Sequence, residues 1–76
     1  MTKPNLQAID PAMAEIVDST TTAGTTYICE AAPGSSASAA VWRCSKLVAA
    51  TGVITWADGD GEFDNIAANR ALLSYV

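Results

Sequence analysis

Short stretches of alternating side chains, separated by turn residues, limit what this chain can fold into. The alternation is clearest over residues 25–31 and 41–48. Successive side chains of an extended strand point to opposite faces, so each stretch predicts a strand with two distinct faces. In the first, one face carries Tyr27, Cys29 and Ala31, and the other carries Thr26, Ile28 and Glu30. In the second, one face carries Trp42, Cys44, Lys46 and Val48, and the other carries Val41, Arg43, Ser45 and Leu47.

Further short elements are predicted on either side of these strands. We expect strands over about 14–20, 53–57 and 72–76, and a short helix or turn over 64–70 with Asp64 as its N-cap. Residues 1–12 are interpreted as an N-terminal arm, and residues 13–76 as a single small β domain. The predicted fold is all-β, a small antiparallel meander forming a compact sandwich or partly open barrel, with one short helical turn.

Size and composition favour assembly with other chains. The sequence has 76 residues, of which only 16% are charged. A chain this short buries a modest fraction of its surface. The stability of a single core is therefore marginal unless a covalent cross-link or partner chains add to it. We therefore expect a homo-oligomer, or a subunit packed against other proteins.

Several classes of function are disfavoured by the residues that are present. The net charge is −4 and the four basic residues form no run, which argues against nucleic-acid binding. No apolar stretch approaches the roughly 20 residues that span a bilayer, and the first residues show no signal-peptide core, so no membrane association is expected. The chain has no histidine, which removes the commonest general base and zinc ligand. We expect no enzyme, cofactor or metal.

Cys29 and Cys44 lie on consecutive predicted strands and admit three interpretations. If the strands pair, the two residues can lie opposite each other and form an intrachain disulfide. Closing a loop of 44 − 29 = 15 residues would contribute about 3 kcal/mol. A disulfide would suggest a protein that works outside a reducing compartment. The cysteines could instead link neighbouring subunits or pack as buried free thiols.

Five short motifs, taken in order, give the chain a resemblance to a known group of proteins. They are Tyr27-Ile-Cys-Glu-Ala-Ala-Pro-Gly-Ser35, Ala40-Val-Trp-Arg-Cys44, Ile54-Thr-Trp-Ala-Asp-Gly59, Phe63-Asp-Asn-Ile66 and Asn69-Arg-Ala-Leu-Leu-Ser-Tyr75. Their order and spacing over residues 25–76 resemble those of small virion structural proteins of tailed bacteriophages. The patterns of that group are Tyr-x-Gly-x-Ala-x-Pro-Gly, Ala-x-Trp-x-Ile, Trp-Ala-Asp-Gly, Phe-Asp and Asn-Arg-x-x-Leu-x-Tyr.

The resemblance implies a place in a virus particle, with other virion proteins as partners, and no catalytic residues. The expected location is the neck or collar, the tail or the capsid surface. This chain departs from the group's pattern at Cys29, where the group has glycine, and at Cys44, where it has a branched apolar residue. Both departures introduce sulfur, which favours a bond within or between subunits over two free thiols.

Aromatic and arginine side chains are the candidate interface residues. Large apolar bodies with a polar handle suit a core or an interface between subunits, and arginine pairs well with carboxylates. The candidates are Tyr27, Trp42, Arg43, Trp56, Phe63, Arg70 and Tyr75. The alternative for the aromatic residues is a sugar-binding platform, which would make the protein a host-receptor or glycan-binding module. The alternative for the two arginines is that they are charges exposed to solvent.

The stretch 58–64 gathers four of the eight acidic residues of the chain. Asp58, Asp60 and Glu62 match the first, third and fifth positions of a helix-loop-helix calcium loop. The glycine required at the sixth position is absent, and Asn69 stands where the bidentate acid belongs. A looser calcium site or a hydrolytic acid pair stays open, but Asp-Gly repeats favour a turn. We expect that turn to end a strand and to return Phe63 toward the core.

Overall fold

The computed structural model describes residues 13–76, and the predicted arm of residues 1–12 lies outside them. The elements are β1 (Ala14–Asp18), β2 (Thr25–Ala31), β3 (Ala40–Val48), β4 (Val53–Trp56), β5 (Asn65–Ile66) and the 3₁₀ helix η1 (Ala67–Leu72). The first four strands form an antiparallel meander in chain order, and β5 pairs with the first half of β3. The predicted all-β meander with one short helical turn is therefore confirmed.

The strands follow the alternation seen in the sequence. β2 buries Tyr27, Cys29 and Ala31, while the residues between them are only partly buried. The short turn between β3 and β4 holds these two strands in register. Between β3 and β4, the Gly52 N–H donates to the Val48 carbonyl at 2.8 Å, and the φ of +71° at Gly52 is one that glycine adopts without a steric cost.

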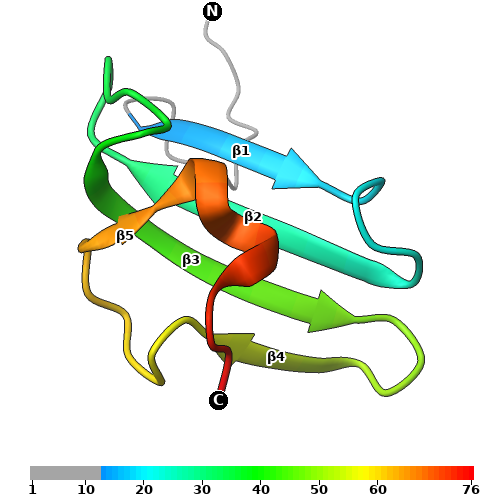
Figure 1. The fold of residues 1–76 in the computed structure, drawn as a ribbon. Helices are drawn as coiled ribbons and strands as arrows, with labels where there is room; N and C mark the ends of the chain where they lie inside the picture. The colour runs from blue at the N-terminus through cyan, green and yellow to red at the C-terminus, as the bar shows by residue number, and fades with distance from the viewer. Residues whose placement is uncertain (1–12) are drawn as a thin grey trace, which may run out of the picture.

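One face of the sheet is covered by η1 and the C-terminal segment (Figure 1). Between them lies a core made mostly of small side chains, which lets the helix approach the strands closely. Within residues 13–76 this covering layer is therefore a helix and an extended tail rather than a second sheet. The buried core residues are Cys29, Ala31, Trp42, Cys44, Ala57 and Ala67.

The C-terminal part of the chain differs from the sequence prediction in three ways. The predicted strand over 72–76 is wrong, because Leu72 ends η1 and only Tyr75 forms a bridge, to Ala57. The predicted N-cap at Asp64 is also wrong, because Ile66 holds that position and makes no side-chain capping bond. Phe63 does not return to the core, and 46% of it is exposed.

Candidate interaction surface

The sheet face turned away from η1 is the candidate interaction surface, and we call it the open face. Antiparallel register places its side chains in three rows across the strands. One row is charged, the next is mostly apolar, and the third combines Thr26 with two aliphatic residues. The open face consists of Glu15, Val17, Thr26, Ile28, Glu30, Arg43, Ser45, Leu47, Ile54 and Trp56.

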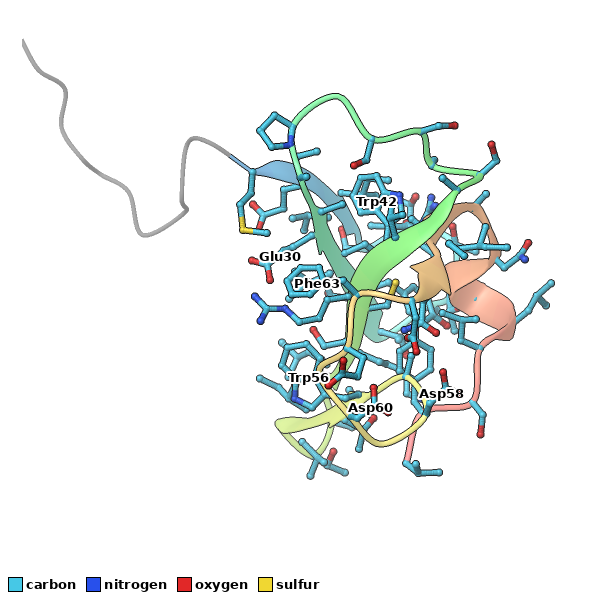
Figure 2. All side chains as sticks on the ribbon, turned by 90° about the vertical axis from the view of Figure 1, so that its left-hand side faces the viewer. Glu30, Trp42, Trp56, Asp58, Asp60 and Phe63 are labelled. Carbon is cyan, nitrogen blue, oxygen red and sulfur yellow. The ribbon has the colours of Figure 1, made fainter. Side chains whose placement is uncertain are left out.

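Arg43 organises one end of the open face. Its Nη2 donates to Glu30 Oε1 at 2.6 Å and its Nε donates to the same oxygen at 3.2 Å. The guanidinium lies 4.8 Å from the centroid of the Phe63 ring and 5.5 Å from that of Trp56, within the range of a cation–π contact. Figure 2 shows Glu30, Phe63 and Trp56 together on the side of the sheet away from η1. Three predicted interface residues, Arg43, Trp56 and Phe63, therefore meet on one surface.

Two acidic residues lie side by side in the charged row. Glu15 on β1 is directly opposite Glu30 on β2. Burial, a hydrogen bond with Glu30 and repulsion from its charge raise the pKa of Glu15. Arg43 pairs with Glu30, so the row carries two acids and one base.

The other four predicted interface residues stabilise the fold itself. Trp42 is 2% exposed, and its Nε1–H donates to the Ser36 carbonyl at 2.8 Å. The rings of Tyr27 and Tyr75 pack with centroids 5.8 Å apart. The Tyr75 hydroxyl donates to the Arg70 carbonyl at 2.8 Å. These contacts hold the C-terminal segment against the sheet.

Arg70 joins the helix to the first strand. Its Nε donates to Asp18 Oδ2 at 2.9 Å, and its Nη1 donates to the Ala67 carbonyl at 3.0 Å. The Asp18 carboxylate also accepts hydrogen bonds from Thr20 and from both the hydroxyl and the backbone N–H of Thr21. Arg70 therefore forms its ion pair within the chain.

Cys29 and Cys44 are cross-strand partners in the core and are free thiols in this structure. The Cys44 carbonyl accepts from the Ala57 N–H, so the backbone of Cys44 points away from β2. Cys29 and Cys44 thus form a non-hydrogen-bonded pair, where Cα atoms lie about 4.5 Å apart, a separation that a disulfide spans. Their mutual hydrogen bond and burial raise the pKa of Cys29. Both residues are inaccessible from outside, which disfavours links to neighbouring subunits.

The acidic stretch forms a turn, as its sequence indicates. Asp58 and Gly59 both have positive φ, the Asp58 N–H donates to the Ser74 carbonyl at 2.7 Å, and the Glu62 N–H donates to Asp60 Oδ1 at 3.0 Å. All four acids of the stretch are exposed. Within residues 13–76 no three acidic, cysteine or histidine side chains are grouped closely enough to hold a metal ion. No helix of these residues is long and apolar enough to cross a membrane.

Sequence reasoning found the aromatic and arginine members of the open face but did not single out its other residues. The alternation over 25–31 and 41–48 already placed Ile28, Glu30 and Leu47 on the faces where they lie. Glu15, Val17 and Ile54 required the pairing of β1 and β4 with their neighbours, which the alternation of a single strand does not give.

The chain matches no protein-family model, and comparison with curated proteins and with solved structures found no significant similarity.

Proposed function

We propose that this protein is a structural component of a tailed-phage virion. It would be built into the neck or collar, the tail or the capsid surface in many copies, and would act by binding neighbouring subunits rather than by catalysis. The observation that carries the proposal is the open face, an exposed surface with aliphatic side chains and the Arg43, Trp56 and Phe63 cluster. The resemblance of the motifs over residues 25–76 indicates which assembly this is, namely a tailed-phage particle.

The positions of the motif residues support this proposal. Trp42, from the second motif, fills the core, and Arg70 and Tyr75, from the last, fasten the C-terminal segment over the sheet. Trp56 and Phe63, from the third and fourth, lie on the open face. The motifs therefore contribute to the stability of the domain and to one surface, as is expected of a subunit that works by packing.

The alternative is a host-receptor or glycan-binding module on the virion surface. Phe63 favours it, because this exposed ring belongs to a polar loop, as sugar-binding aromatic residues often do. Arg43, however, lies over the rings of both Phe63 and Trp56. The guanidinium group therefore partly covers the ring faces on which a sugar would stack. For this reason we favour a structural role in assembly over glycan binding.

Purified particles of the phage that carries this gene test the proposal. Quantitative mass spectrometry should find the chain at a fixed copy number per particle, and antibody-gold labelling should locate it at one part of the virion. Absence from particles, with the chain present in infected cells, would refute the proposal. Labelling at the distal tip, with host-cell adsorption lost in Phe63→Ala particles that assemble normally, would favour the receptor-binding alternative.

A further inference from the structure

A mostly apolar band, interrupted by Ser45, crosses the open face. Val17, Ile28, Ser45 and Trp56 are consecutive cross-strand partners, and Leu47 pairs with Ile54 in the next row. Val17 is 62% exposed and Ile54 is 55% exposed. Within residues 13–76 no helix or further strand packs on this band. Exposed apolar residues that form a contiguous patch, unlike scattered ones, mark interaction sites.

A charged row borders the band on one side and carries an excess acid. Glu15, Glu30 and Arg43 follow one another across β1, β2 and β3. Arg43 is already engaged by Glu30 and by the two aromatic rings. Within residues 13–76 no cation forms an ion pair with Glu15. Covering this row with a purely apolar surface would strip water from a carboxylate without replacing it, which is costly.

We propose that the open face docks a different protein, through an apolar patch flanked by a lysine or arginine that pairs with Glu15. The inference rests on the proposed function in that this partner is another component of the same particle. A second copy of this chain fits the open face less well. It would bring the same pair of acids, and the one cation that its described residues place on this face, Arg43, is already bound to Glu30.

Photo-cross-linking during infection tests the docking site. The photoreactive residue p-benzoylphenylalanine is placed at Val17 or at Ile54 on the open face. The matched control has it at Leu72, which is 84% exposed on η1. We expect positions 17 and 54 to give an adduct with one and the same other protein, mapped to apolar residues beside a lysine or arginine. Leu72 should not give that adduct.

Charge variants test the pairing with Glu15. Glu15→Lys should lower the yield of the adduct at least about tenfold, equivalent to about 1.4 kcal/mol. Glu62→Lys, in the exposed acidic turn, makes the same charge change and should leave the yield within twofold. Circular dichroism of both variants checks that the fold is kept. Where Glu15→Lys unfolds the domain, Glu15→Gln replaces it and should lower the yield in the same direction.

The docking site, the pairing with a basic residue and the virion role can each be overturned by a separate result. Adducts between two copies of this chain, equal adducts from Leu72, or no adduct from Val17 and Ile54 would each overturn the docking site. A yield that is unaffected by Glu15→Lys in a folded protein would overturn the pairing with a basic residue. An adduct found only outside the particles would support the docking site and refute the virion role, so the two proposals fail separately.

Discussion

The two tryptophans of the chain have opposite surroundings although both lie on β-strands. Trp42 is enclosed between the sheet and the C-terminal layer, and its indole N–H has a partner in the Ser36 carbonyl. Trp56 is half-buried on the open face beside Arg43. A tryptophan in a strand motif therefore does not by itself indicate on which face of the sheet its side chain lies. The register of the strand with its neighbours decides that.

Replacing each tryptophan by alanine should separate these roles. Removing a large buried aromatic side chain costs about 3–5 kcal/mol, a large share of the stability of a domain this small. We expect Trp42→Ala to unfold at much lower urea concentration or not to fold at all, and Trp56→Ala to lose less than half as much stability. Urea unfolding followed by circular dichroism measures both. Equal losses would show that the open face is as well packed as the core.

At Gly59 both the backbone conformation and the lack of space for a side chain favour glycine. Its φ is +75°, and an added Cβ would lie 2.9 Å from Cγ2 of Val76. Gly61, two residues away, has room for a Cβ at 3.7 Å from Cδ of Arg43. A left-handed backbone costs a non-glycine residue about 1–2 kcal/mol.

We therefore expect Gly59→Ala to lower the free energy of unfolding by about 1 kcal/mol or more, while Gly61→Ala changes it little. Thermal unfolding of the two variants side by side gives the comparison. If Gly61→Ala were the more damaging change, the assigned geometry of the acidic turn would be wrong.

At the scale of elements, the bounds of the strands are predicted best where the alternation of inward and outward side chains is long. β2 was predicted with its observed bounds and β3 to within one residue, because seven or more alternating residues give a clear period of two. β1 ends at Asp18 rather than near residue 20, because Asp18 accepts hydrogen bonds from Thr20 and Thr21 and turns the chain.

The rest of the fold depends on contacts that are remote in sequence. β5 has two residues, too few to show any period, and exists because it pairs with β3. Leu72 and Tyr75 suggest a strand by composition, but the bond from the Tyr75 hydroxyl to the Arg70 carbonyl folds that segment back over the core. The open face could be predicted in part, from the faces of β2 and β3, while its full extent depends on the pairing of four strands.

The Cys29 and Cys44 pair links β2 to β3 and gives a prediction for the oxidised protein. Refolding with oxidised glutathione should join the two sulfur atoms, while two electrons and two protons convert each glutathione disulfide to two thiols. The 15-residue separation predicts a gain of about 3 kcal/mol. The midpoint of urea unfolding should rise accordingly over that of the reduced protein.

Thiol labelling and electrophoresis check the same pair. In the folded, reduced protein both cysteines should react slowly with iodoacetamide, because they are buried, and quickly in urea. On a non-reducing gel the oxidised protein should run as a monomer with a small mobility shift, which Cys44→Ala removes. A ladder that collapses on reduction would mean links between subunits, and full labelling without unfolding would contradict the buried pair.

At the scale of the whole molecule, the Asp18 and Arg70 pair joins the first described strand to the last helix across 52 residues. The hydroxyl of Thr21, the backbone N–H groups of Thr20 and Thr21, and Arg70 hold the pKa of Asp18 well below its ordinary value of 3.8. A group whose pKa is lower in the folded state contributes stability above the unfolded value. That contribution is lost as the pH falls below 3.8.

Asp18→Asn should therefore lower the melting temperature at neutral pH and flatten its decline in acid. The measurement is the melting temperature of both proteins between pH 6 and pH 2. The two curves should approach each other below about pH 3.8. Asp60→Asn, in the exposed turn, serves as the control and should leave the difference between neutral and acid pH unchanged. Parallel curves for Asp18→Asn and the wild type would contradict this role of the pair.

The cover of the core by η1 and the C-terminal segment has a consequence for synthesis. The hairpins of the meander join neighbours in sequence, so they can begin to form while the chain is still emerging from the ribosome. Their core face stays exposed until residues 67–76 leave the exit tunnel, because those residues supply Ala67, Leu73 and Tyr75. Completion of the fold thus has to wait until residues 67–76 have been made. A stalled or shortened chain would expose apolar side chains on both faces of the sheet, and such a form is prone to aggregate.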